Sequence, residues 1–187
     1  MRNIYHRCYR LRGALMAPPY LVILFCTTGE FERDGIIWPV GLLVFLAGLG
    51  LRVWAQRYVK YRLPIRKQLA VAGPYRFMRN PIYVGNTLLL VGLTILSELV
   101  WFVPFMLLWA ATVYFFVVRY EESHLVEKYG APYSAYLASV PRWFPRGPLK
   151  AVPHAGQLGG LWASVVVELH CLLLIIPLAC KEILEWI

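Results

Sequence analysis

The amino-acid sequence predicts an all-α polytopic membrane protein with about five transmembrane helices. Hydrophobic residues make up 59% of the 187 residues and charged residues 16%, against roughly 45–50% and 25% in soluble domains. The apolar residues form long blocks, and a bilayer core of about 30 Å is crossed by about 20 helical residues. We therefore expect a single membrane domain over residues 1–187, with spans at about residues 13–29, 36–55, 81–96, 100–118 and 158–180.

The third and fourth spans come from one apolar block that is too long for a single crossing. Residues 84–118 contain one charged residue, Glu98, and would form a helix of roughly 50 Å at about 1.5 Å per residue. Ser97 and Glu98 interrupt this block, and Pro104 stands where the first turn of a new helix accepts proline. The pattern indicates a tight helical hairpin.

The distribution of basic residues supports five spans and predicts their orientation. Four Lys and Arg precede the first span, eight lie in residues 52–80 and five in residues 119–157, whereas the alternate segments hold one, none and one. Because basic residues concentrate in cytoplasmic loops, we expect the N-terminus and both long polar segments in the cytoplasm and the C-terminus on the opposite side. The N-terminal apolar run is longer than a signal peptide core, so we expect an uncleaved first span.

Several other features receive structural interpretations. The net charge of +9 does not indicate a nucleic-acid partner, because the basic residues are not interleaved with the apolar blocks. The four cysteines show no CxxC spacing, so neither a metal site nor a disulfide framework is predicted. Gly48 and Gly50 lie inside a span and suggest a helix–helix contact. Glu168 and His170, two residues apart in the last span, point to different helix faces and are expected to pack or hydrogen-bond between helices.

The first polar segment contains signals for a turn and then for a helix start. Gly73-Pro74 indicates the turn. Asn80 is a strong N-cap residue and Pro81 is favoured at the first helical position. The free N–H groups and the positive dipole end of this helix would form an anion site at the cytoplasmic surface. Tyr75 and Tyr83 flank the helix start and could line a pocket there.

The second polar segment continues the fourth span beyond the membrane as a helix to about Tyr129. Gly130 is expected to end this helix and Pro132 to keep it ended. Glu121 shares one face with Leu125 and Tyr129, at i, i+4 and i+8. Glu121 and Glu122 are costly beside lipid, so they should point into water or into a protein pocket.

These residues together resemble the signature of the isoprenylcysteine carboxyl methyltransferase and phospholipid methyltransferase superfamily. Residues 73–85 read GPYRFMRNPIYVG. The second half of the signature appears as Glu121-Glu122, Leu125, Tyr129-Gly130, Tyr133, Tyr136, Val140-Pro141-Arg142 and Pro145. The two halves flank a hydrophobic hairpin of the expected size, and the resemblance covers about residues 68–145.

The resemblance implies that S-adenosylmethionine binds at the cytoplasmic end of the helices, without a Rossmann domain. The implied cofactor contacts are Gln68, Leu69, Ala70, Tyr75, Asn80, Pro81, Ile82, Tyr83 and Glu121. The superfamily also places an arginine near the carboxylate pair to hold the acceptor. This implies catalytic roles for Arg119, the nearest candidate, and for Glu122. The eukaryotic carboxyl methyltransferases have histidine where this chain has Asn80.

The implied activity is methyl transfer from S-adenosylmethionine to a lipophilic or prenylated acceptor that enters from the bilayer. The closest likeness is to isoprenylcysteine carboxyl O-methyltransferases. The alternative is N-methylation of an aminolipid, which needs a base such as Glu121, Glu122 or His124. Two further alternatives are a nicotinamide-dependent reductase, since sterol reductases share a similar signature, and a non-catalytic membrane subunit.

Overall fold

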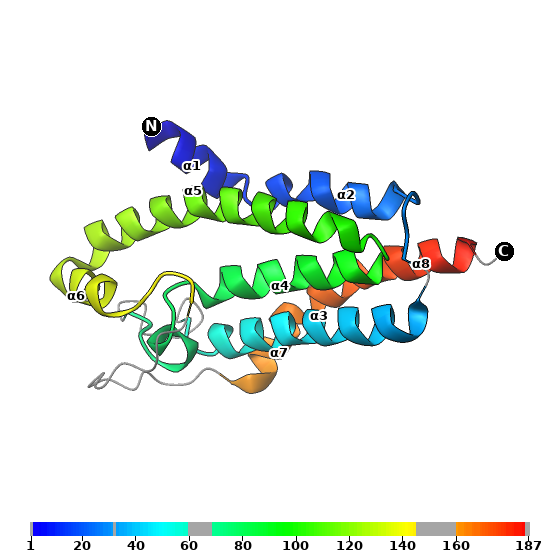
Figure 1. Cartoon of the computed structure of the whole chain (residues 1–187). Helices are drawn as coiled ribbons and strands as arrows, with labels where there is room; N and C mark the ends of the chain where they lie inside the picture. The colour runs from blue at the N-terminus through cyan, green and yellow to red at the C-terminus, as the bar shows by residue number, and fades with distance from the viewer. Residues whose placement is uncertain (1, 32, 60–68, 145–159, 186–187) are drawn as a thin grey trace.

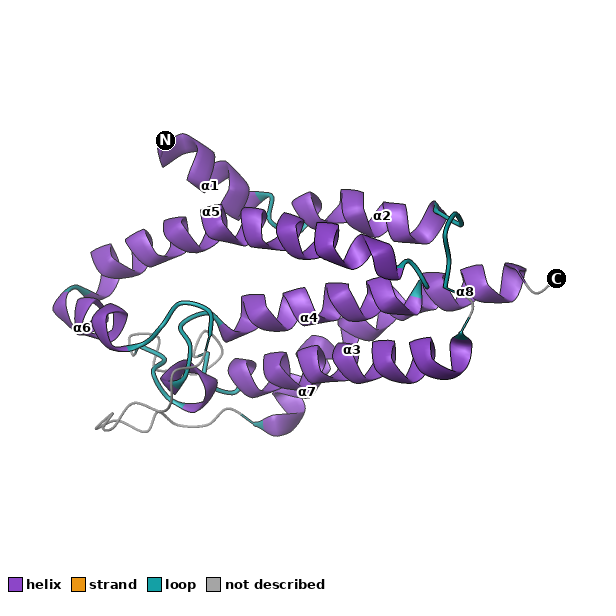
Figure 2. Cartoon of the chain, in the orientation of Figure 1, coloured by secondary structure: helices purple, strands orange, loops and turns teal. Residues whose placement is uncertain are grey.

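A computed structural model describes residues 2–31, 33–59, 69–144 and 160–185, and every regular element in these ranges is helical (Figure 1). Figure 2 shows helices joined by loops, with no strand in the described part of the chain. The predicted all-α fold is therefore confirmed. The elements are α1 (Arg2–Arg10), η1 (Ala14–Met16), α2 (Ala17–Phe25), α3 (Asp34–Gln56), η3 (Gly73–Arg76), α4 (Pro81–Leu96), η4 (Val100–Phe102), α5 (Val103–Tyr129), α6 (Ala131–Ser139), α7 (Leu161–Glu168), η5 (Leu169–Leu174) and α8 (Ile175–Glu185).

Apolar helices occupy all five predicted span positions. Three are long and apolar enough to cross a membrane, namely Asp34–Gln56, Val100–Tyr129 and Leu161–Lys181. Two are shorter, Ala14–Phe25 and Pro81–Leu96. The chain is thus a helical membrane protein. The count of five crossings and their orientation remain predictions, although the two termini lie toward opposite ends of the helices, as that orientation requires (Figure 1).

α3 and α4 pack closely along their length because glycines bring their backbones together. A Cβ on Gly48 would lie 2.8 Å from the carbonyl oxygen of Gly85, and one on Gly92 would lie 2.6 Å from the nitrogen of Phe45. The predicted helix–helix contact is therefore confirmed for Gly48. It is wrong for Gly50, where an added Cβ would meet nothing within 4 Å.

The predicted hairpin between α4 and α5 is confirmed. α4 ends at Leu96, and the chain turns through Ser97 and Glu98. Glu98 adopts a φ of 63°, and its carbonyl oxygen accepts a hydrogen bond of 3.1 Å from the backbone N–H of Phe31. Pro104 lies in the first turn of α5, where its missing N–H leaves no helical bond unmade.

α5 extends past its predicted span to Tyr129, and this extension creates the space for a site. It ends at Gly130, as predicted, with a φ of 63°. α5 stays ended there, but a second helix that was not predicted, α6, starts at Ala131 with Pro132 in its first turn. Proline is accepted there for the same reason as in α5. The chain therefore reverses direction, and α6 lies beyond the start of α4 (Figure 1).

Candidate functional site

A cavity of about 440 Å³ lies where α4 begins and α5 projects beyond it. Its volume falls within the roughly 300–1,000 Å³ of small-molecule sites. Its walls come from η3, the first turn of α4, the last turns of α5 and helix α6. The lining residues are Val59, Leu69, Ala70, Tyr75, Arg79, Asn80, Pro81, Ile82, Tyr83, Glu121, Glu122, Leu125, Lys128, Tyr129, Tyr133 and Tyr136.

The N-terminus of α4 forms one wall of the cavity. Asn80 occupies the N-cap position and Pro81 the first helical position, as predicted. The Asn80 side chain, however, does not cap the helix. Its Nδ2 instead donates a hydrogen bond of 3.3 Å to the carbonyl oxygen of Arg142. The capping role expected for this side chain is therefore wrong, and the backbone N–H groups of the first turn are left without a side-chain cap beside the cavity.

Tyr83 and Glu121 form a hydrogen-bonded pair on the cavity wall. The Tyr83 hydroxyl donates to Glu121 Oε2 at 2.9 Å. The Tyr83 ring packs on Tyr114 of α5, with ring centroids 4.9 Å apart. The pair therefore links the first turn of α4 to α5, and it fixes the orientation of the Glu121 carboxylate.

Glu122 is held by two arginines from outside its own helix. Arg142 donates through Nε to Oε1 at 3.1 Å and through Nη2 to Oε2 at 2.6 Å. Arg79 Nη1 lies 3.4 Å from Oε1, and the Arg79 backbone N–H donates to the carbonyl oxygen of Pro141 at 2.9 Å. The buried Glu122 carboxylate thus ties together the segment before α4, helix α5 and the segment after α6.

Tyrosines from η3 and α6 form a buried wall opposite α4. The Tyr136 hydroxyl donates to the carbonyl oxygen of Tyr75 at 2.8 Å, and the rings of Tyr133 and Tyr136 lie 5.8 Å apart. Burial raises the pKa of both Tyr133 and Tyr136, and the nearby charge of Glu122 raises the pKa of Tyr133 further. Both phenols therefore stay protonated at neutral pH, and the one proton of Tyr136 is used in its bond to Tyr75.

Eight of the nine residues predicted to contact a cofactor line this cavity. They are Leu69, Ala70, Tyr75, Asn80, Pro81, Ile82, Tyr83 and Glu121. The ninth, Gln68, lies outside the described residues, as does Pro145 at the other end of the signature. Of the two residues predicted to be catalytic, Glu122 lines the cavity and Arg119 does not.

The structure places Arg119 on a different face of α5. Its side chain is exposed, and its guanidinium carbon lies 4.4 Å from the centroid of the Phe115 ring. The arginines beside the carboxylates are Arg79 and Arg142. Sequence reasoning did not assign them to the site, although both stand within the two halves of the signature. Sequence reasoning also missed Lys128. Its position on the same helix, one residue before Tyr129, could have indicated that it lies near the site.

No group of three His, Cys, Asp or Glu side chains that could hold a metal ion occurs within the described ranges. The polar groups that line the cavity are the N–H groups at the start of α4, the carboxylates, the phenols and two basic side chains, Arg79 and Lys128. Such a set suits a polar organic molecule carrying both positive and negative groups.

The fold is that of a helical membrane protein. Its cavity lies between the start of α4 and the polar end of α5 and is large enough for a small molecule. The family is shown by sequence comparison, in which the model of the phospholipid methyltransferase family matches residues 37–132. The chain belongs to this family, and the superfamily expected from its motifs is confirmed. The matched segment runs from α3 to the first turn of α6, so it contains most of the cavity wall.

Two curated relatives are named as metal resistance proteins. The chain is 30% identical over 132 residues to the nickel-cobalt-cadmium resistance protein NccN of Alcaligenes xylosoxydans xylosoxydans, covering 67% of this chain and 60% of the relative. It is 31% identical over 124 residues to the cobalt-zinc-cadmium resistance protein CzcN of Cupriavidus metallidurans, covering 63% of this chain and 56% of the relative. The chain thus spans at most 60% of the length of these relatives.

Proposed function

We propose that this protein is an S-adenosylmethionine-dependent methyltransferase that acts on a lipophilic acceptor in the membrane. The observation that carries the proposal is the cavity at the start of α4. It gathers eight residues that the family signature singles out for cofactor contact, from three separate parts of the chain. Membership of the phospholipid methyltransferase family supports the same chemistry.

The cavity residues fit the chemical groups of S-adenosylmethionine. The first turn of α4, around Ile82 and Tyr83, would hold the cofactor's carboxylate, because backbone N–H groups and the helix dipole favour an anion there. Glu121 would accept hydrogen bonds from the amino group or the ribose hydroxyls. The tyrosines and the apolar side chains of Leu69 and Leu125 would contact the adenine ring.

When bound, the sulfonium supplies a methyl group for an in-line displacement. The protein's own part is to hold the two reactants in line and to exclude water. Glu122 and its two arginines form a rigid base for the cavity, because the carboxylate is bound through both oxygens. The hydroxyl of Tyr83 holds the Glu121 carboxylate in one orientation at the cavity wall.

The acceptor class that we favour is a carboxylate, as in the isoprenylcysteine carboxyl methyltransferases. A carboxylate is already nucleophilic at neutral pH. Arg79 and Arg142 beside Glu122, and Lys128 in the cavity lining, supply positive charge that would orient the acceptor carboxylate. The second candidate is an aminolipid, which the description of the matching family favours. An amine acceptor needs a base. Glu121 has no arginine partner among the ion pairs of the described residues, so it is the cavity carboxylate that suits this role.

The proposal is tested by following methyl label in membranes that contain the protein. The membranes receive methyl-labelled S-adenosylmethionine together with lipid and prenylcysteine extracts, and the organic phase is then treated with mild base. Release of the label as methanol identifies a methyl ester and hence a carboxylate acceptor. Label that survives base identifies an N-methylated lipid.

The matched controls are Glu121→Ala and Ser123→Ala. Ser123 lies exposed on the same helix and donates only to the carbonyl oxygen of Tyr120, so its variant should keep wild-type labelling. The wild-type protein should label at least one fraction, and Glu121→Ala should not. Equal labelling by wild type and Glu121→Ala in every fraction would contradict the proposed site.

A further inference from the structure

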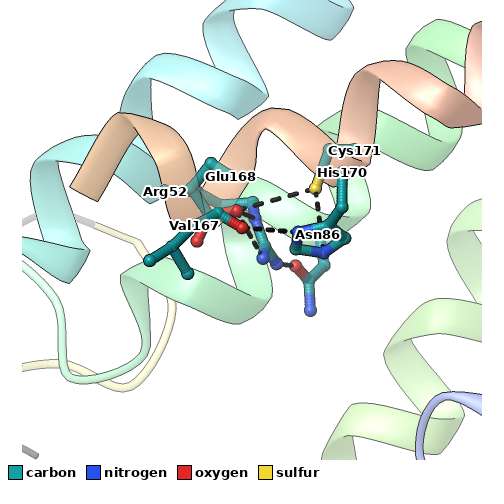
Figure 3. A network of polar contacts seen from close by, with 6 residues as sticks. All are labelled: Arg52, Asn86, Val167, Glu168, His170 and Cys171. Atoms are coloured by element: carbon teal, nitrogen blue, oxygen red, sulfur yellow. Dashed lines mark hydrogen bonds and ion pairs between the residues drawn. The ribbon is translucent and has the colours of Figure 1, made fainter. Parts of the chain in front are cut away.

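A buried ion pair joins α7 to α3 within the apolar part of the molecule (Figure 3). Arg52 of α3 donates to Glu168 Oε2 through Nε at 2.7 Å and through Nη2 at 2.6 Å. The Glu168 side chain is completely buried, and the Arg52 side chain is 12% exposed. Glu168 Oε1 has no hydrogen-bond partner among the described residues. The expectation that Glu168 bonds between helices is therefore confirmed.

A buried ion pair contributes little net stability to the contact between two helices. Both charges lose their hydration on burial, and apolar side chains of similar volume commonly stabilise a contact equally well. Ionisable residues inside membrane helices usually have a functional role. The pair therefore needs an explanation beyond helix packing.

The remaining arm of Arg52 reaches α4. Its Nη1 donates to Asn86 Oδ1, and Figure 3 shows the guanidinium lying between Glu168 and this amide. α4 also makes room for the arginine, since a Cβ on Gly85 would lie 2.6 Å from Arg52 Cγ. Arg52 of α3 thus contacts both α4 and α7.

Asn86 continues these contacts toward the cavity. Asn86 lies three residues after Tyr83 on α4, so the two side chains stand on neighbouring positions of one helix face. The Tyr114 ring packs on Tyr83, with centroids 4.9 Å apart, and the Tyr83 hydroxyl donates to Glu121 at 2.9 Å. Side-chain contacts therefore run from Glu168 through Arg52 to Asn86, and α4 itself joins Asn86 to the Tyr83–Glu121 pair one turn earlier.

We propose that Arg52 and Glu168 are positioning residues for the cavity, acting through Asn86 and the first turns of α4 on the Tyr83–Glu121 pair. The inference rests on the proposed function, because it assigns the pair a role in S-adenosylmethionine binding. α7 lies outside the segment that matches the family, and Arg52 lies inside it. The ion pair therefore makes the C-terminal helix a part of the site without any direct contact with the ligand.

The test separates positioning from simple anchoring with the variant Arg52→Lys. A lysine keeps the charge opposite Glu168, but it is a single ammonium and cannot also hold Asn86 in the fork geometry of a guanidinium. An anchor needs only the charge, so anchoring predicts wild-type stability and wild-type affinity. Positioning predicts a melting temperature close to wild type and S-adenosylmethionine binding weakened by about threefold to tenfold.

A second variant and a control complete the experiment. Glu168→Gln should weaken binding in the same way. Glu30→Gln removes an ion pair between the loop that joins α2 to α3 and helix α8, formed by Glu30 and Lys181 at 2.5 Å, which lies away from the cavity. It should lower the melting temperature and leave the affinity unchanged.

The environment of Tyr83 provides a readout that needs no ligand. In protein labelled with 3-fluorotyrosine, the fluorine resonance of Tyr83, assigned from Tyr83→Phe, should move in Arg52→Lys and Glu168→Gln and stay in place in Glu30→Gln. An unmoved resonance together with unchanged affinity in both network variants would overturn the positioning role. Absence of binding by the wild-type protein would instead contradict the proposed function, and the resonance would still decide the coupling.

Discussion

Tyr83 contributes to the cavity in two separable ways, through its hydroxyl and through its ring. The hydroxyl donates to Glu121, and the ring packs on Tyr114. A hydrogen bond to a carboxylate contributes about 1.5–3 kcal/mol. Tyr83→Phe removes the bond that orients Glu121. We therefore expect it to weaken S-adenosylmethionine binding by about threefold to tenfold.

The measurement is a titration of S-adenosylmethionine into detergent-solubilised protein. Tyr120→Phe is the control, because Tyr120 lies on the same part of α5 as Glu121 but stacks on Tyr9 outside the cavity. Equal affinities for Tyr83→Phe and the wild type would remove this hydrogen bond from the site.

Arg142 and Arg119 allow the geometry around Glu122 to be tested directly. Arg142 binds both oxygens of the carboxylate, whereas Arg119 stacks on Phe115 at the exposed face of α5. Lysine cannot reproduce the two-pronged contact. Arg142→Lys should therefore lower the free energy of unfolding by about 1–2 kcal/mol, whereas Arg119→Lys should change it by less than about 0.5 kcal/mol. Thermal melts of both variants check this order, and the reverse order would contradict the assignment of Arg142.

At the scale of elements, close packing against α3 holds α4, the helix whose N-terminus forms one wall of the cavity. These helices approach closely at Gly48, where a side chain would meet the backbone of α4. Added atoms in a packed contact cost about 1–3 kcal/mol. Gly48→Ala should therefore lower the melting temperature clearly, and Gly50→Ala, two residues away with open space around it, should not. A similar loss for both variants would contradict the close contact as the cause; helix propensity cannot produce such a loss, because alanine favours a helix more than glycine does.

The elements that the sequence predicts well are those with a signal at each end. α4 matches its expected bounds because Pro81 starts it and Ser97-Glu98 interrupts the apolar block. α6 was missed because Pro132 is compatible both with the end of one helix and with the start of another. Its presence depends on tertiary packing, since Tyr133 and Tyr136 are buried against the segment before η3 and against α5.

Site residues could be predicted where they follow one another in a continuous motif. They could not be predicted where the contact joins residues that are far apart in the sequence. Residues 80–83 form one helix start, so their grouping follows from local structure. Arg142 lies 20 residues after Glu122 and reaches it only because α6 reverses the chain. Arg119 stands three residues before Glu122, a spacing at which helical side chains can meet, but its guanidinium lies on the exposed Phe115 ring instead.

At the scale of the whole molecule, the arrangement of charge predicts one orientation in the membrane. The cavity lies at the end of the molecule where the basic segments gather, and we expect that end in the cytoplasm. A reporter that is active only outside the cytoplasm should be active when fused to the C-terminus and inactive when fused to the N-terminus. Equal activity at both ends would contradict an odd number of crossings.

The central claim is that the cavity at the start of α4 binds S-adenosylmethionine, and equilibrium titration of the purified protein in lipid nanodiscs tests it most directly. The account predicts saturable binding by the wild type and by Ser123→Ala, and loss of binding in a Glu121→Ala protein that still melts as a folded membrane protein. Absence of saturable binding by the wild type, or unchanged affinity in Glu121→Ala, would contradict it.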